Sequence, residues 1–137
     1  MSKIELLSNE HVALWFHTDQ KIVHHEIRGF APSREFRNLL TRGAELIEQH
    51  HAQKWLSDDT RSSPIRTEDY HWGDTVWAPR VIAAGFKYWA IVLPNKAVAQ
   101  IQMQRFCEEY RARGVTVELF EKADRGLAWL GSVDGAS

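Results

Sequence analysis

The sequence predicts a single α/β domain built on a mixed β-sheet. Three observations predict it. The chain has 137 residues, which suits one domain. Strand patterns fill its first part, and helical and strand patterns then alternate to its end. Such alternation implies right-handed crossovers and a sheet that is largely parallel in its C-terminal half. The composition, 44% hydrophobic and 26% charged, is that of a globular protein.

Three strands are expected before the first helix. They cover residues 4–7, 11–17 and 22–28, and Val12, Leu14 and Phe16 recur with the period of two that a strand requires. The polar residues 18–21 fit a hairpin turn between the second and third strands. Gly29 then ends the third strand, so the N-terminal part is predicted to be antiparallel.

The rest of the chain alternates. A helix is expected from Ser33, as its N-cap, to about His50, and a strand covers 54–57. A second helix is expected from Thr67, also as N-cap, to Gly85, with Pro79 kinking or restarting it. The apolar strand 87–93, the helix 99–110, the strand 115–120 and the helix 123–130 follow. The predicted order is β-β-β-α-β-α-β-α-β-α, with the domain at 1–131 and a flexible tail at 132–137.

Charge and cysteine content exclude several classes of protein. The net charge of −1 gives no strong field to attract nucleic acid or an acidic membrane. No apolar run is long enough for a secretory signal or a membrane span. Cys107 is the single cysteine, which agrees with a cytoplasmic location, and it is expected to be a small core residue.

Several segments, in this order and spacing, carry a resemblance to a known family. They are Glu26-Ile27-Arg28-Gly29-Phe30, Glu35-Phe36, Lys54-Trp55-Leu56-Ser57-Asp58, Trp77-Ala78-Pro79-Arg80, Ala84-Gly85, Tyr88-Trp89-Ala90-Ile91-Val92, and Phe120 with Ala128-Trp129-Leu130. The chain resembles, from about Leu14 to Leu130, the small bacterial STAS-like proteins, which share the SpoIIAA-like fold of anti-sigma-factor antagonists. The resemblance implies a mixed sheet with helices packed on it and a regulatory or binding role.

The chain departs from that family at one loop. Signalling STAS domains carry an Asp-Ser-Ser-Gly-like turn whose serine is phosphorylated. The matching residues 57–64 are longer and contain no glycine. We therefore predict that the loop from Ser57 to Ser63 is not a working phosphoswitch.

Two groups of polar residues were considered as reactive sites. Asp58 and Asp59 follow a strand, where open α/β sheets bind ligands, and with Glu68 and His71 they could do acid–base work or hold a metal. The favoured interpretation is a solvated loop in which Asp58 caps a turn, because adjacent carboxylates are common and no ligand spacing is enforced. The seven histidines have no chelating spacing, and His24 and His25 should point to opposite faces of a strand. Neither a metal site nor a cofactor is predicted.

The second helix carries two apolar stripes about 200° apart around its axis. Tyr70, Trp77, Val81 and Ala84 form one, and Trp72, Val76, Pro79 and Ala83 form the other. A helix covering one face of a sheet needs a single stripe. The second stripe could be core, a partner surface, or the wall of a small-molecule pocket.

The leading interpretation is a non-enzymatic binding or regulatory module that forms a homodimer through the second helix. The module could also bind a different protein. One alternative is a carrier of a small apolar or lipidic ligand, in a cavity lined by Trp55, Trp72, Trp77 and Trp89. The other is a small enzyme using Asp58, Asp59 and His71. The candidate ligand or partner surface comprises Trp55, Asp58, Asp59, Tyr70, His71, Trp72, Val76 and Trp77.

Overall fold

The computed structural model describes residues 3–133 and contains a six-stranded sheet with the strands in chain order. The strands are β1 (Lys3–Ser8), β2 (Val12–His17), β3 (Ile22–Ile27), β4 (Lys54–Asp58), β5 (Tyr88–Val92) and β6 (Thr116–Phe120). β1, β2 and β3 pair antiparallel, whereas β3 to β6 pair parallel. The predicted mixed sheet with an N-terminal antiparallel part is confirmed.

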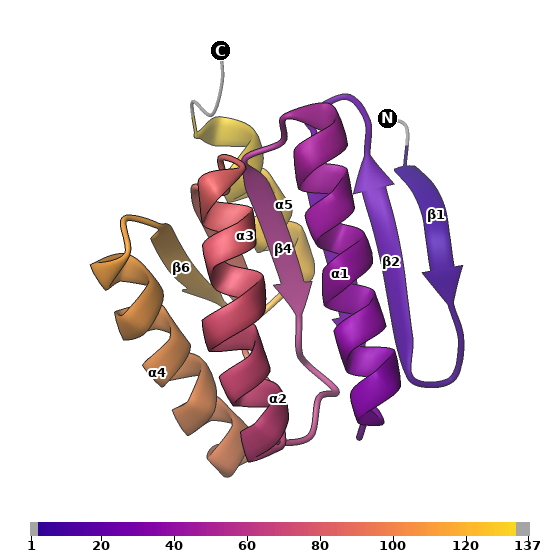
Figure 1. Cartoon of the computed structure of the whole chain (residues 1–137), viewed down its shortest axis with the longest axis vertical. Coiled ribbons are helices and arrows are strands. Elements are labelled where there is room, and N and C mark those ends of the chain that lie inside the picture. The colour runs from indigo at the N-terminus through magenta and orange to yellow at the C-terminus, as the bar shows by residue number, and fades with distance from the viewer. Residues whose placement is uncertain (1–2, 134–137) are drawn as a thin grey trace.

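The helices cover both faces of the sheet. They are α1 (Ser33–His50), α2 (Thr67–Trp72), the π-helical turn η1 (Gly73–Trp77), α3 (Ala78–Ala83), α4 (Ala97–Ala112) and α5 (Ala123–Ser132). In Figure 1, α1, α4 and the continuous α2–η1–α3 rod lie in front of the sheet, and α5 lies behind it. The predicted element order is therefore confirmed.

Each face has its own core. The large core lies under α1, the rod and α4 and includes Leu14, Leu39, Trp55 and Ile91. The smaller one lies under α5 and includes Leu56, Ala90 and Leu130. Leu56 and Trp55 are neighbours in β4 that face opposite cores, as the alternation of a strand requires. β4 and β5 are thus covered on both sides, which explains why 88–92 is a continuous apolar run.

The helix starts differ from those predicted. Ser33 and Thr67 are the first helical residues, and Pro32 and Arg66 occupy the N-cap positions without side-chain caps. The hydroxyl of Ser33 instead donates to Asp69, at 2.9 Å, and so ties α1 to α2. α5 runs to Ser132, one residue past the predicted end of the domain. Residues 134–137 of the predicted tail lie outside the described residues.

A new helical segment, α3, begins at Ala78 with Pro79 in its first turn, which agrees with the predicted restart at this proline. The rod continues through it, and the chain widens into the π-helical turn η1 directly before α3. A proline has no N–H to donate and its ring crowds the preceding turn, so a locally wider turn accommodates it. The rod ends at Gly85, whose φ of 113° favours glycine.

α1 approaches the sheet most closely at Gly43. The ring of Trp55 occupies the space that a β-carbon on residue 43 would need. Such a β-carbon would lie 2.9 Å from Trp55 Cζ2 and 2.8 Å from Trp55 Cζ3. A glycine at this position therefore lets the indole ring approach the α1 backbone closely. In the part of the chain that the structure describes, no helix is long and apolar enough to cross a bilayer.

Candidate functional site

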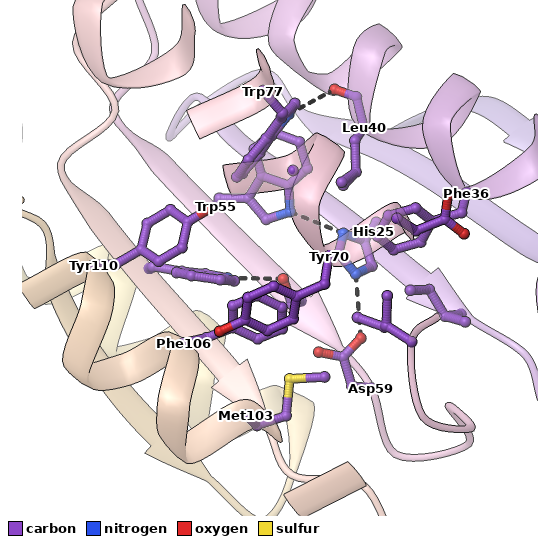
Figure 2. Close-up of a pocket in the computed structure, with 16 residues that line it drawn as sticks. His25, Phe36, Leu40, Trp55, Asp59, Tyr70, Trp77, Met103, Phe106 and Tyr110 are labelled. Atoms are coloured by element: carbon purple, nitrogen blue, oxygen red, sulfur yellow. Dashed lines mark hydrogen bonds and ion pairs between the residues drawn. The ribbon is translucent and has the colours of Figure 1, made fainter. Parts of the chain in front are cut away.

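A cavity of about 50 Å³ lies between the helix layer and the sheet, towards the C-terminal ends of the parallel strands. Open α/β sheets bind ligands at this edge. Figure 2 shows side chains from β3, β4, α1, α2 and α4 converging on it. The lining is mainly apolar and aromatic: His25, Ile27, Phe36, Leu40, Trp55, Ser57, Asp59, Ile65, Asp69, Tyr70, Gly73, Trp77, Trp89, Met103, Phe106 and Tyr110.

The sheet supplies the floor of the cavity through strand alternation. His25 is paired with Ser57 in the parallel register of β3 and β4. Both face the helices, as do Trp55 in β4 and Trp89 in β5. Asp59 comes directly after β4, and its backbone N–H donates to the Val92 carbonyl at 3.2 Å. That bond holds the first turn of the loop against β5.

The three indoles of the cavity have their N–H groups engaged. Trp55 Nε1 donates to His25 Nδ1 at 2.9 Å, and Trp89 Nε1 donates to Ser57 Oγ at 2.8 Å. Trp77 Nε1 donates to the backbone carbonyl of Leu40, at 2.9 Å. Buried tryptophans need such partners because an unpaired N–H is costly in an apolar core. The rings are thereby held in fixed orientations.

A buried histidine–aspartate pair forms the polar end of the cavity. Asp59 Oδ1 lies 3.3 Å from His25 Nε2, and the two side chains are 4% and 6% exposed. An indole N–H can only donate, so Nδ1 of His25 must be unprotonated where it meets Trp55. The proton of the neutral ring is then on Nε2, which donates to Asp59.

Asp69, the second buried carboxylate of the lining, has both oxygens occupied. Oδ1 accepts from Arg37 Nε and Oδ2 from the Ser33 hydroxyl, each at 2.9 Å. The Arg37 charge offsets that of Asp69, and both partners come from α1. Asp69 is therefore a structural link between α1 and α2.

Tyr70 and Phe106 close the gap between α2 and α4. Their rings stack with centroids 4.8 Å apart, and the Tyr70 hydroxyl donates to Glu109 Oε1 at 2.5 Å. Burial, together with Glu109, raises the pKa of Tyr70 to about 12, so the hydroxyl keeps its proton at neutral pH. Both side chains are partly exposed. The cavity thus lies one side chain below the surface.

Four of the predicted surface residues line this cavity: Trp55, Asp59, Tyr70 and Trp77. Of the four tryptophans predicted to line a ligand cavity, Trp72 is absent from the lining. It is half-buried, and the Arg37 guanidinium lies 5.4 Å from its ring centroid. Its stripe partners Val76, Pro79 and Ala83 are exposed. The first stripe of the second helix therefore faces the core, and the second faces outward.

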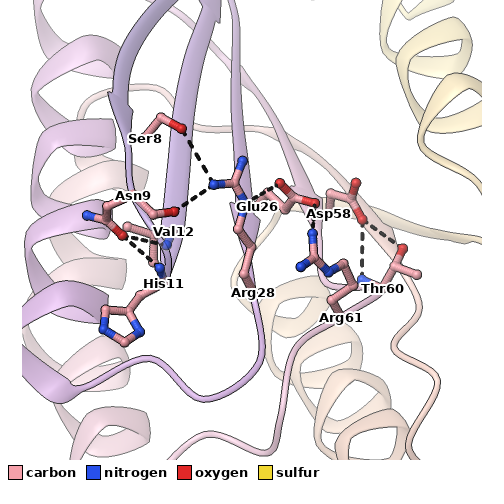
Figure 3. Close-up of polar contacts among 9 residues, drawn as sticks. All are labelled: Ser8, Asn9, His11, Val12, Glu26, Arg28, Asp58, Thr60 and Arg61. Carbon is pink, nitrogen blue, oxygen red and sulfur yellow. Dashed lines mark hydrogen bonds and ion pairs between the residues drawn. The ribbon is translucent and has the colours of Figure 1, made fainter.

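Asp58 and His71 lie away from the cavity. Asp58 Oδ1 accepts from the backbone N–H and the hydroxyl of Thr60, at 3.2 and 2.7 Å, as a turn-capping aspartate does (Figure 3). His71 is exposed on α2. Among the described residues no hydrogen bond or ion pair joins Asp58, Asp59 and His71. The structure does not bring the proposed acid–base group together.

Two polar residues of the cavity, His25 and Ser57, were not predicted as site residues. The signal was present for His25, because it shares the buried face of β3 with Val23 and Ile27. A histidine on an otherwise apolar face needs a partner there. As predicted, His24 faces the other way, and it contacts His17 at 3.0 Å.

Ser57, His25 and Asp59 do not form a hydrolytic triad. In such a triad one histidine nitrogen takes the serine proton and the other is held by the acid. Here both nitrogens of His25 are engaged, one by Trp55 and one by Asp59. Within residues 3–133, no three His, Cys, Asp or Glu side chains are grouped as metal ligands.

Strand order, crossovers and helix placement define a SpoIIAA-like, that is STAS-like, fold. The solved structure of an uncharacterized DUF3478-family protein with a SpoIIAA-like fold, from Shewanella loihica PV-4, is similar to this chain, with a TM-score of 0.66. The match covers 91% of this chain and 98% of the other, at 15% identity. No family model matches the sequence, and no curated protein matches it. The likeness confirms the predicted fold.

Proposed function

We propose that this protein is a non-enzymatic binding module that holds a small, mainly apolar molecule in the cavity between its helices and its sheet. The observation that carries the proposal is the cavity itself. It lies at the ligand-binding edge of a parallel sheet and is walled mainly by apolar and aromatic side chains, and its three indole N–H groups are already paired. Walls that are mainly apolar favour an occupant with an apolar body.

Xenon tests the proposal because it is apolar and small enough for cavities of this kind. We expect xenon under pressure to shift the indole N–H resonances of Trp55, Trp77 and Trp89. Trp15 and Trp129 lie outside the lining and serve as internal controls. Equal responses from all the indoles, or no response at all, would contradict the proposal.

A filled cavity provides the matched control. Leu40 lines the cavity from α1, so Leu40→Phe should occupy part of the roughly 50 Å³ and reduce the xenon response. A thermal melt of the variant checks that it still folds. An undiminished response in the folded variant would place the xenon site elsewhere.

We propose, as a second function, self-association through the outward stripe of the second helix. Val76 is 53% exposed, beside the half-buried Trp72. Burying such side chains in a two-fold contact is favourable, and the net charge of −1 opposes it little.

Sedimentation at tens of micromolar tests the second proposal, with a dimer expected. Val76→Glu should shift the protein to monomer, whereas Thr75→Glu, at the neighbouring exposed position, should not. A monomeric wild type would refute it.

A further inference from the structure

We propose that the molecule held in the cavity carries a small ammonium group, which donates to Asp59 Oδ2. The inference rests on the proposed function of the cavity and specifies its ligand. It follows from an unused acceptor, an uncompensated charge and an aromatic wall that meet at one place.

The unused acceptor is the second oxygen of Asp59. Oδ1 faces His25, whereas among the described residues no donor reaches Oδ2. No fully buried side-chain oxygen or nitrogen of residues 3–133 lacks a partner, so Oδ2 must border open space. Asp59 is only 3% exposed, and it is one of the residues that line the cavity. In Figure 2 the carboxylate points towards the space beside Tyr70, Phe106 and Met103.

The charge of Asp59 has no counterion in the cavity wall. His25 is neutral, because Nδ1 accepts from Trp55. The wall contains no lysine or arginine. The other carboxylate of the wall, Asp69, is already paired with Arg37. A buried carboxylate is strongly favoured when a cation pairs with it. A cationic ligand group would supply the charge that the chain does not.

The rest of the wall also suits a cation. Seven of the sixteen lining residues are Phe, Tyr or Trp. The three indole N–H groups of the wall already donate to Leu40, His25 and Ser57. Aromatic faces attract ammonium groups, most strongly where water is excluded. A neutral hydroxyl would gain the hydrogen bond to Oδ2 without this attraction.

The cavity size limits what can enter. A volume of about 50 Å³ exceeds the roughly 10–15 Å³ that a cavity needs to hold one water molecule. It suits a group of about two heavy atoms, such as the end of an alkylamine. Methylammonium is therefore the appropriate probe, and methanol is its neutral isostere.

The test is an NMR titration of the wild-type protein, read on the indole N–H signals of Trp55, Trp77 and Trp89. We expect methylammonium chloride to half-saturate the shifts at a concentration at least tenfold lower than methanol, with sodium chloride producing no comparable shift. Methanol binding as well as methylammonium would overturn the inference. A response to xenon with none to methylammonium would overturn it alone, whereas no response to either would overturn the proposed function as well.

A pair of adjacent aspartates provides the control variants. Asp59→Asn removes the charge with little change of shape, and we expect it to reduce the preference for methylammonium below threefold while xenon still binds. Asp58→Asn removes the neighbouring charge outside the cavity and should retain the preference. A preserved preference in folded Asp59→Asn would overturn the inference. Should that variant not fold, the wild-type comparison of the two probes decides.

Discussion

Replacing Gly43 by alanine should destabilise the protein, although alanine is the better helix former. The new β-carbon would lie within 2.9 Å of two Trp55 ring carbons, and closer still to Cη2. Trp55 is 1% exposed and its indole N–H is bonded to His25, so any shift of the ring disturbs that bond. The indole or the α1 backbone must therefore be displaced.

The magnitude follows from three opposing effects. Alanine in a helix interior gains about 1 kcal/mol over glycine. Overpacking a close-packed core costs about 1–3 kcal/mol. Loss of the bond from Trp55 to His25 adds about 1 kcal/mol. The free energy of unfolding should fall by about 1–3 kcal/mol.

Gly73 is the matched control for this substitution. It also lies within a helical segment, and a β-carbon there would meet nothing within 4 Å. Gly73→Ala should therefore stabilise the protein by up to about 1 kcal/mol. Urea denaturation followed by tryptophan fluorescence measures both variants, and the Trp55 indole N–H signal reports displacement. A Gly43→Ala protein at least as stable as the wild type, with that signal unchanged, would refute the reasoning.

Two further predictions concern pH and phosphorylation. Burial, and after it the neighbouring His17, lowers the pKa of His24 to about 3 from an ordinary 6.5. As the pH falls, the unfolded chain takes up the proton before the folded protein does, so the free energy of unfolding should fall by about 2 kcal/mol between pH 7 and pH 5. His24→Gln should lessen this loss, whereas His71→Gln, at an exposed position, should not. Urea denaturation at a series of pH values measures both variants. Ser57 and Ser62 are each 1% exposed, and the other two hydroxyls of the loop are bonded to Asp58 and Lys96. Mass spectrometry of protein isolated from cells should accordingly find no stoichiometric phosphate on Ser57, Thr60, Ser62 or Ser63, and finding it would contradict the prediction.

Hydropathy patterns were sufficient to predict the order of the elements, because burial and period agree along most of the chain. The alternation of Val12, Leu14 and Phe16 lies on one face of β2, against α1. The apolar run at 88–92 is a strand covered on both sides. Helix starts were less predictable, since a serine or threonine suits either an N-cap or the first turn. At Ser33 the choice depends on a distant residue, Asp69.

The cavity could be predicted only in part. The alternative of a ligand carrier placed Trp55, Trp77 and Trp89 at a cavity between helix and sheet, and all three line the one observed. The pairing of His25 with Asp59 joins residues 34 positions apart, and no local spacing reveals it. Trp72 was misplaced because a helical stripe gives direction around one helix and not the position of neighbouring side chains. Arg37 of α1 lies over that ring instead.

The tryptophans of the large core also explain why few of its polar groups are left without a hydrogen-bond partner. Each large ring brings one N–H that must be satisfied, and the acceptors used are a helix carbonyl, a histidine and a serine. Those bonds occupy His25 Nδ1 and direct the Trp89 N–H onto Ser57, the two groups that could otherwise have acted on a substrate. Asp59 keeps a vacant acceptor as well, because no donor among the described residues reaches its second oxygen. We therefore expect the same packing that makes the core rigid to leave ligand binding to a single carboxylate.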